Sequence, residues 1–349
     1  MRVVITGATG NVGTSLLEVL AAEQQVEEIV AIARRRPQRP FPRTTFVEAD
    51  IVTSDLSELM RGADAVVHLA WLIQPGRDES VTHAVNVAGS ERVFRAAAYA
   101  RVPALIHASS VGAYSKGPKD RFVDETWPTE GTSTSFYARH KASSERQLDR
   151  LERERPEMRI VRVRPGLIFK REAAAEVRRL FAGPFLPGSL LRPGLIPLVP
   201  DVPCLRFQGV HSLDVADAYR RALLSGARGA FNVAADPVIG PAELAEIFHA
   251  RRVKLSSGLL RGAAAATFAV RLQPTEPGWV DMALAVPLMD CTRARVELGW
   301  EPRHSAVDAL AELIAGMRAG SDLDTPPLAR RASGPGRLRE LLTGIGGRV

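Results

Sequence analysis

The segment "RVVITGATGNVG", residues 2 to 13, joins a short apolar run to a loop with glycines at positions Gly7, Gly10 and Gly13. Glycine at a turn from strand to helix permits a positive φ, so the backbone can approach a ligand closely. The amides that begin the following helix then point at an anion such as a pyrophosphate. The spacing is G-x-x-G-x-x-G, not the standard G-x-G-x-x-G. The segment predicts the first β-α turn of a dinucleotide-binding fold.

Apolar runs alternate with helical patterns through the first half of the chain. This alternation is typical of a parallel sheet with helices on both faces. We therefore predict the α/β class, with a Rossmann-type doubly wound parallel sheet. Strands are expected at 2–6, 28–33, 44–49, 65–70, 104–109 and 159–164, and helices at 15–22, 81–100 and 136–155.

The pattern changes after Arg164. Residues 181–203 are apolar but contain six prolines, so they predict a covering loop or a pocket lining and exclude a single helix or a central strand. Beyond them we expect strands at 205–210 and 230–235, a helix at 213–224 and helical segments to about residue 318. The predicted organisation is a Rossmann domain at 1–170, a smaller mixed substrate-binding region at 171–320 with segments that return to the first sheet, and a basic, flexible tail at 321–349.

The charge and the cysteines narrow the functional classes. The net charge is +7, and the Gly-rich segment from Arg330 to Val349 carries +4 of it, which is typical of a solvated extension. We therefore expect no nucleic-acid partner. Cys204 and Cys291 predict neither a disulfide framework nor a metal site. No signal peptide and no membrane-spanning run is evident, so we expect a cytoplasmic protein without a membrane partner.

Tyr137 and Lys141 in "SFYARHKAS" are four residues apart. On a helix this spacing places both side chains on one face. A free tyrosine titrates near 10, so acid/base work near neutrality needs a shift of about 3 units, roughly 4 kcal/mol. An isolated Tyr-Lys pair is usually an ordinary surface pair. Here the pair follows "IHASSVGAY", where a strand ends in Ser109 and Ser110, and such strand ends are where α/β sheets place ligands.

These residues resemble the extended short-chain dehydrogenase/reductases, also called the NAD-dependent epimerase/dehydratase family. The resemblance covers residues 1 to about 318. The matching segments stand in family order: "TGATGNVG", "ADI" at 49–51, "VVHLA", "NVAGS", "HASSVGAY", "YARHK", "VRPGLIF", "HSLDVADA" and "ARVELGWEP".

The resemblance implies a role for each matching residue. Tyr137 is the general acid/base, and Lys141 holds the nicotinamide ribose and lowers the pKa of the phenol. Ser110 hydrogen-bonds the reacting oxygen, and Asn86 is the structural asparagine of the active-site helix. Relatives commonly dimerise through the helices that carry Asn86 and Tyr137, so a homodimer is expected. The expected cofactor-binding set is Gly7, Thr9, Gly10, Asn11, Val12, Gly13, Asp50, Ile51, Leu69, Ala70, Tyr137, Lys141, Pro165, Gly166 and Ile168.

Departures from the family pattern narrow the chemistry. Dehydratases and decarboxylases of the family carry an acidic residue directly after the catalytic Ser or Thr, and here that residue is Val111, followed by Gly112. Epimerases that act by enolisation recruit additional acid/base groups, often a Cys, beside this loop, and neither cysteine lies near it. Simple hydride transfer to or from a small-molecule substrate is therefore expected.

Three functions remain open. An oxidoreductase acting on a hydrophobic ketone or alcohol is favoured by the apolar "PFLPGSLLRPGLIPLVP" at 184–200. A nucleotide-sugar epimerase acting through a transient ketone is the alternative, with Arg206 as a phosphate-binding candidate. A non-catalytic dinucleotide-sensing protein ranks last, because such relatives usually lose the Tyr or the Lys.

Three arginines, Arg34, Arg35 and Arg36, follow the second expected strand. NAD-preferring members of this fold place a carboxylate about 20 residues past the glycine loop, where it binds the ribose 2′-hydroxyl. That position is Ala33 here. Arginine suits a 2′-phosphate, so we predict NADP as cofactor in preference to NAD, with Arg34 and Arg35 as its ligands. A solvated charge run is the alternative interpretation.

Overall fold

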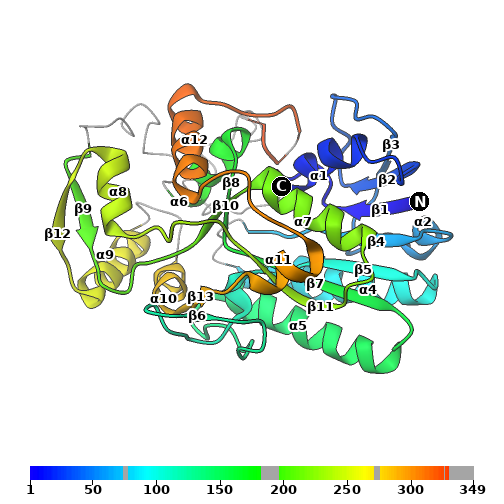
Figure 1. Ribbon diagram of the computed structural model, residues 1–349, viewed down its shortest axis with the longest axis horizontal. Helices are drawn as coiled ribbons and strands as arrows, with labels where there is room; N and C mark the ends of the chain where they lie inside the picture. The colour runs from blue at the N-terminus through cyan, green and yellow to red at the C-terminus, as the bar shows by residue number, and fades with distance from the viewer. Residues whose placement is uncertain (74–77, 182–195, 271–275, 326, 330–349) are drawn as a thin grey trace.

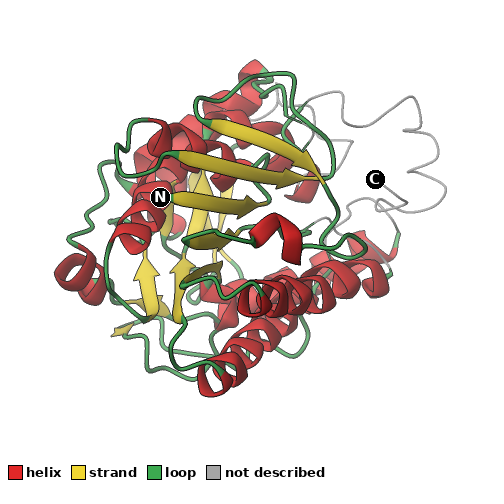
Figure 2. Cartoon of the chain, turned by 90° about the vertical axis from the view of Figure 1, so that its right-hand side faces the viewer, coloured by secondary structure: helices red, strands yellow, loops and turns green. Residues whose placement is uncertain are grey.

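The computed structural model describes residues 1–73, 78–181, 196–270, 276–325 and 327–329. Its centre is a seven-stranded parallel sheet in the order β11-β7-β5-β4-β1-β2-β3. The sheet strands are β1 (Arg2–Thr6), β2 (Glu28–Ala33), β3 (Thr44–Glu48), β4 (Ala65–His68), β5 (Ala104–Ala108), β7 (Arg159–Pro165) and β11 (Gly229–Val233). Figure 2 shows these strands between helices on both faces. The prediction of a doubly wound Rossmann-type sheet is confirmed.

The remaining elements surround the sheet or lie beyond it. Short strands pair in twos: β6 (Phe122–Val123) with β13 (Leu288–Met289), β8 (Leu167–Phe169) with β10 (Gly209–His211), and β9 (Leu198–Asp201) with β12 (Arg251–Lys254). The helices are α1 (Asn11–Ala21), α2 (Ser57–Met60), α3 (Glu79–His83), α4 (Ser90–Tyr99), α5 (Phe136–Glu154), α6 (Ala174–Phe181), α7 (Ser212–Leu224), α8 (Pro241–Phe248), α9 (Ser257–Ala269), α10 (Gly278–Ala285), α11 (Thr292–Leu298) and α12 (Ala306–Ala319). A π-helical turn (Ala84–Gly89) joins α3 to α4, and 3₁₀ turns lie at Val111–Ala113 and Arg171–Ala173.

Alternation along each strand builds a core on each face of the sheet. Val3 and Ile5 of β1 pack with apolar residues of α1 and α7, whereas Val4 packs with those of α2, α4 and α5. Strands buried on both faces are expected in a parallel sheet because helices cover both sides. In Figure 1 the unit of α8, α9, β9 and β12 lies at the opposite end of the molecule from β1 to β3.

The order of strands reverses at β1. The chain runs from β1 to β2 and β3 on one side, and β4, β5, β7 and β11 follow on the other. In open α/β sheets, the carboxyl ends of the strands at such a reversal form a crevice that binds ligands. The glycine loop follows β1 here, and Leu69 to Trp71 follow β4.

Most expected elements form, and two expectations need correction. The six strands expected in the first half form with bounds that differ by at most two residues, and the strand expected at 230–235 forms as β11. The strand expected at 205–210 was wrong in extent, because Phe207 instead bridges Ile239 and only Gly209–His211 is a strand. The helix expected at 15–22 begins earlier, at Asn11, since the glycine loop continues directly into the helix.

The flexible tail at 321–349 stays a prediction, because most of it lies outside the described residues. Thr325 and Leu328 are buried, so the described part of this segment packs on the protein. Residues 330–349, like residues 182–195 of the proline-rich segment, lie outside the described residues. The division of the chain at residues 170 and 320 stays a prediction.

Candidate active site

The glycine loop forms a tight backbone cradle at the start of α1. Gly7 has φ of +72°, and a Cβ at this position would lie 2.5 Å from the Ala70 backbone nitrogen. A Cβ at Gly13 would lie 2.4 Å from the Gly7 carbonyl oxygen. Only glycine therefore fits at Gly7 and Gly13, and the cradle brings the ends of β1 and β4 together.

The positive end of α1 is free to bind an anion. Its N-cap is Gly10, which supplies no side-chain cap, and its first turn has no acidic residue. The first amides of a helix have no acceptor within the helix, and here they belong to Asn11, Val12 and Gly13. The Asn11 Oδ1 atom is buried and has no hydrogen-bond partner among the described residues. The loop, including the buried Thr9, fits the pyrophosphate of a dinucleotide.

The expected adenosine-side residues lie beyond the ends of β2 and β3. The side chains of Arg34 and Arg35 are exposed and form no ion pair within the described part of the chain. The Asp50 carboxylate accepts a hydrogen bond from the Val52 amide at 2.8 Å, so this aspartate stabilises a turn. Ile51 is buried and lies against Gly89.

The expected nicotinamide-side residues follow β7. A Cβ at Gly166 would lie 2.4 Å from the Gln208 carbonyl oxygen, so this glycine permits the crossing of two backbone segments. Pro165 ends β7, and Ile168 pairs with Val210 in the small β8-β10 sheet. Leu69 and Ala70 stand directly after β4, beside the glycine loop.

Ser110 and Tyr137 meet where β5 ends and α5 begins. The Ser110 Oγ accepts a hydrogen bond from the Gly112 amide at 3.0 Å, and the Ser110 hydroxyl lies close enough to the Tyr137 phenol to lower its pKa. A Cβ at Gly112 would lie 2.9 Å from the Tyr137 ring. The absence of a side chain at Gly112 therefore makes room for the Tyr137 ring.

Lys141 is buried one helical turn beyond Tyr137. Only 3 % of its surface is exposed, and its Nζ donates to the Ala108 carbonyl oxygen at 2.6 Å. The Nζ lies 3.4 Å from the Trp71 ring centroid and 5.7 Å from that of Tyr137. Burial lowers the pKa of Lys141 well below its ordinary value, against the attraction of Glu145.

The expected lowering of the Tyr137 pKa is not a property of the protein alone. Burial raises the pKa of this phenol to about 12, and the nearby Ser110 hydroxyl only partly opposes the shift. The ammonium of Lys141 faces Trp71 and Ala108 instead of the phenolic oxygen. That Lys141 lowers the pKa of this phenol when a nicotinamide is bound stays a prediction.

Asn86 stabilises the loop after β4 from within the π-helical turn. Its Oδ1 accepts from the Leu72 amide at 2.7 Å, and its Nδ2 donates to the Leu72 carbonyl at 2.8 Å. That Asn86 is the structural asparagine of the active-site helix stays a prediction. The fixed loop also carries Trp71, so Asn86 helps to position the indole ring beside Lys141.

Two tryptophans flank Tyr137 and were not predicted. The Trp71 and Tyr137 ring centroids are 6.0 Å apart, and those of Trp279 and Tyr137 are 5.2 Å apart. Trp279 and the buried Met282 belong to α10, which comes from the second half of the chain. A Cβ at Gly278 would lie 2.1 Å from the Thr134 carbonyl oxygen, so this glycine lets α10 approach α5 closely. The walls around Tyr137 are aromatic and apolar.

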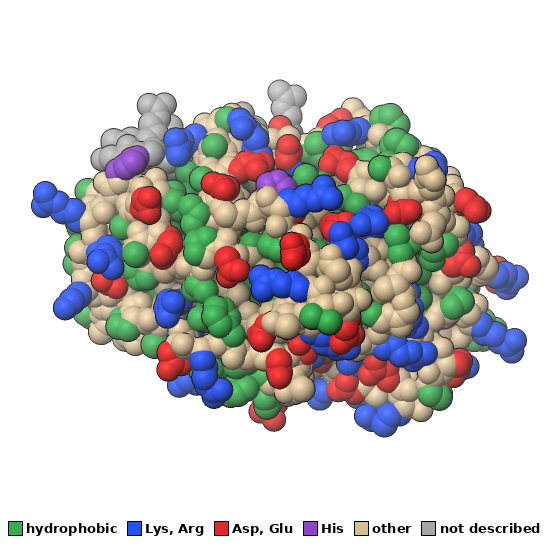
Figure 3. Space-filling model, viewed as in Figure 1, with side chains coloured by type: hydrophobic (Ala, Val, Ile, Leu, Met, Phe, Trp, Pro, Cys, Tyr) green, Lys and Arg blue, Asp and Glu red, His purple; other side chains and the backbone are tan. Residues whose placement is uncertain are grey.

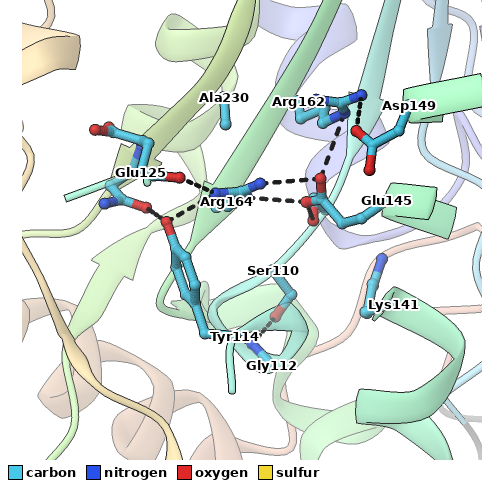
Figure 4. A network of polar contacts seen from close by, with 12 residues as sticks. Ser110, Gly112, Tyr114, Glu125, Lys141, Glu145, Asp149, Arg162, Arg164 and Ala230 are labelled. Atoms are coloured by element: carbon cyan, nitrogen blue, oxygen red, sulfur yellow. Dashed lines mark hydrogen bonds and ion pairs between the residues drawn. The ribbon is translucent and has the colours of Figure 1, made fainter. Parts of the chain in front are cut away.

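A buried ionic network lies behind Ser110 and Lys141 (Figure 4). The Glu145 carboxylate accepts from Arg164 Nε at 2.8 Å and Nη2 at 3.0 Å, and from the Ser109 hydroxyl at 2.5 Å. Arg162 Nε lies 3.3 Å from Glu145, and Arg164 also donates to the Tyr114 hydroxyl at 3.0 Å. Although burial opposes it, the Arg164 guanidinium lowers the pKa of Glu145. The network joins α5 to β7 and to the end of β5, which carries Ser109 and Ser110.

The comparisons with known proteins identify the family. The model described as "NAD dependent epimerase/dehydratase family" matches residues 3–234. The chain belongs to this family. Its members are NAD-dependent epimerases, dehydratases and reductases, and a nicotinamide dinucleotide is their cofactor. The glycine loop described above fits such a group.

Three relatives illustrate how similar known proteins are to this chain, and each is less than 30% identical to it. An uncharacterized protein of Mycobacterium tuberculosis is 28% identical over 321 residues, which are 91% of this chain but 30% of that protein, so the chain spans less than a third of its length. A UDP-glucose 4-epimerase of Mycolicibacterium smegmatis is 27% identical over 336 residues, 91% of this chain and 99% of that protein. A ketoreductase of Stigmatella aurantiaca, which acts on a farnesylated dihydroquinoline oxide, is 28% identical over 184 residues, 52% of this chain and 54% of that protein.

Solved structures share the fold. The UDP-glucose 4-epimerase of Thermus thermophilus in complex with NAD has a TM-score of 0.67 at 19% identity, and the match covers 91% of this chain and 99% of that one. Within the described residues, no helix is both long and apolar enough to cross a lipid bilayer. On the face shown in Figure 3, basic and acidic side chains are interspersed.

Proposed function

We propose that the protein is an NADP(H)-dependent oxidoreductase that reduces a carbonyl group, or oxidises the corresponding alcohol, with Ser110, Tyr137 and Lys141 at the reaction centre. The observation that carries the proposal is the placement of Tyr137 against the turn at residues 110–112, with the buried Lys141 one helical turn away and its Nζ 5.7 Å from the Tyr137 ring centroid. These side chains belong to the same edge of the sheet as the glycine loop.

The chain's own residues then handle the proton. A bound nicotinamide dinucleotide supplies or accepts the hydride. Tyr137 gives its phenolic proton to the carbonyl oxygen during reduction and recovers it during oxidation. Ser110 donates a hydrogen bond to the same oxygen, and Lys141, whose Nζ is 5.7 Å from the Tyr137 ring centroid, stabilises the phenolate by charge.

The substrate that suits this site is an apolar, ring-containing ketone or alcohol. Trp71 and Trp279 flank Tyr137, and Met282 is buried beside them. Such walls bury apolar surface well and offer few groups to a sugar hydroxyl. The ketoreductase relative of Stigmatella aurantiaca supports the same substrate class.

A paired substrate assay tests the proposal. The purified protein is given NADPH with a panel of aromatic and polycyclic ketones, and separately UDP-glucose without added nucleotide. We expect net oxidation of NADPH with at least one ketone. A protein that binds NADPH tightly but oxidises none of it on the whole panel is instead a dinucleotide-sensing protein.

A nucleotide-sugar epimerase is the second candidate, favoured by the full-length match to the UDP-glucose 4-epimerase of Mycolicibacterium smegmatis. Arg206, the phosphate-binding candidate, is exposed, and its Nη1 donates to the Lys119 carbonyl at 2.9 Å. An epimerase would convert UDP-glucose to UDP-galactose with no net change in reduced nicotinamide. Loss of that activity in Arg206→Ala would support this function over ours.

We propose that Arg34 and Arg35 make the protein bind NADP in preference to NAD. The double variant Arg34→Ala/Arg35→Ala is expected to lower the ratio of NADP to NAD affinity by about tenfold or more, because arginine binds phosphate through charge-assisted hydrogen bonds. Titration of both nucleotides into the variant and into wild type measures the ratio. Arg36→Ala is the matched control, with no change expected. An unchanged ratio in the double variant would make all three arginines solvated surface charges.

The homodimer, the cytoplasmic location and the absence of nucleic-acid and membrane partners stay predictions. The helices expected at the dimer interface are α4 and α5. Their outer faces carry charged side chains such as Arg95 and Arg150, together with the exposed Tyr99. Sedimentation of the purified protein would decide the oligomeric state.

A further inference from the structure

Lys170 is a buried cation that none of the predicted roles uses. It follows β8 directly, at the end of "VRPGLIFK", and only 5 % of its surface is exposed. Its Nζ donates to the Thr14 hydroxyl oxygen at 3.2 Å and to the Ser15 hydroxyl oxygen at 3.1 Å. Both hydroxyls belong to α1, so Lys170 attaches the second half of the site to the helix that begins at the glycine loop.

The Lys170 ammonium has no close counter-ion. Within the described ranges, no carboxylate lies within ion-pair distance of its Nζ; the surrounding charged groups are Glu18 on α1, Glu172 on the 3₁₀ turn, Glu312 on α12, Arg39 after β2 and His211 on β10. Burial lowers the pKa of Lys170, against the attraction of Glu18, Glu172 and Glu312. Burying an ammonium without a paired anion costs folding free energy. The burial of the Lys170 ammonium therefore calls for another source of negative charge.

The hydroxyl groups connect Lys170 to the open end of α1. Thr14 Oγ1 donates to the Gly10 and Asn11 carbonyl oxygens, each at 3.0 Å. Ser212 Oγ is hydrogen-bonded to Ser15 Oγ at 2.9 Å and lies 3.2 Å from the Asn11 carbonyl oxygen. Thr14 is about 4.5 Å along the helix axis from Asn11, at about 1.5 Å per residue. The ammonium is therefore within roughly 8 Å of an anion bound at the first turn.

We propose that Lys170 is a positioning residue for the dinucleotide pyrophosphate, supplying positive charge beneath the first turn of α1 and holding that turn through Thr14 and Ser15. The inference rests on the proposed dinucleotide-binding function. Lys170 then contributes to nucleotide affinity through the pyrophosphate alone. Arg34 and Arg35, in contrast, act on the 2′-phosphate.

Calorimetric titration of three nucleotides tests the assignment. NADP, NAD and ADP-ribose all carry the pyrophosphate, and only NADP carries the 2′-phosphate. Lys170→Met is expected to weaken the binding of all three nucleotides by the same factor, between about fivefold and thirtyfold. This factor corresponds to the Coulomb attraction lost over about 8 Å at an effective dielectric constant near 20. The ratio of NADP to NAD affinity is expected to stay at the wild-type value.

Two further variants make the result decisive. Lys119→Met removes a partly buried lysine, whose Nζ donates to the Arg206 and Ala283 carbonyls, and is expected to leave nucleotide affinity unchanged. Lys170→Gln retains hydrogen-bonding capacity without the charge, and it replaces Lys170→Met if that variant unfolds. Wild-type affinity for NADP and ADP-ribose in a folded Lys170 variant overturns the inference. If the wild-type protein binds none of the three nucleotides, that result refutes the proposed function instead.

Discussion

Tyr137→Phe is expected to lower kcat for carbonyl reduction by about 10²- to 10⁴-fold, the range that general acid catalysis contributes. The substitution removes one oxygen atom and keeps the ring that packs between Trp71 and Trp279. Because the phenol pKa is raised to about 12 in the free protein, Tyr137 is protonated at neutral pH, which is the form required to donate. The substrate KM and the nucleotide affinity are expected to change little.

Steady-state kinetics on the best substrate of the panel measure this effect. Tyr99→Phe is the matched control, since Tyr99 lies on α4 and is 77% exposed, and its kcat is expected to equal that of wild type. Equal kcat for Tyr137→Phe and wild type would remove Tyr137 from the reaction. If kcat falls by the same factor in Tyr137→Phe and in Tyr99→Phe, the loss reflects damage to the fold.

Glu145→Leu is expected to lower the free energy of unfolding by about 3 to 5 kcal/mol, the cost of breaking a buried ion pair from one side. Glu145 is the shared partner of Arg164, Arg162 and Ser109. Without its carboxylate, the buried Arg164 guanidinium keeps, among the described residues, the Tyr114 hydroxyl and the Glu125 carbonyl as hydrogen-bond partners. Urea denaturation of wild type and of Glu145→Leu measures this difference in the free energy of unfolding.

Two comparisons separate burial of charge from loss of packing. Asp149→Leu removes a half-exposed partner of Arg162 and is expected to cost less than about 1 kcal/mol. The double variant Glu145→Leu/Arg164→Leu is expected to cost less than the sum of its single substitutions, because no guanidinium is left unpaired by the loss of Glu145. Additive costs, or a loss for Glu145→Leu as small as that for Asp149→Leu, would contradict this account of the network.

The sheet could be predicted from sequence because its signals are local. The strands β1, β2, β4 and β5 are short, largely apolar runs, and the glycines of the first turn show where β1 passes into a helix. The extent of β10 could not be predicted in this way, since Phe207 pairs with a residue distant in sequence, Ile239.

The candidate site was predictable only in part. The spacing of Tyr137 and Lys141 and the strand end at Ser110 are visible in the sequence. Trp71 had a usable signal, because it stands directly after the ligand-binding end of β4. Trp279 had none, since only tertiary packing brings α10 against α5. Glu145 lies one turn beyond Lys141, but its partners Arg162 and Arg164 are on β7 and become neighbours only in the folded sheet.

The central claim is that hydride passes between the nucleotide and a carbonyl carbon at Tyr137. The most direct measurement uses NADPH deuterated at the transferable position with the best ketone of the panel, and mass spectrometry of the product. We predict one deuterium on the carbinol carbon of the product alcohol, formed by wild type and almost absent with Tyr137→Phe. An undeuterated alcohol, or deuterated alcohol formed equally fast by Tyr137→Phe, would contradict the account.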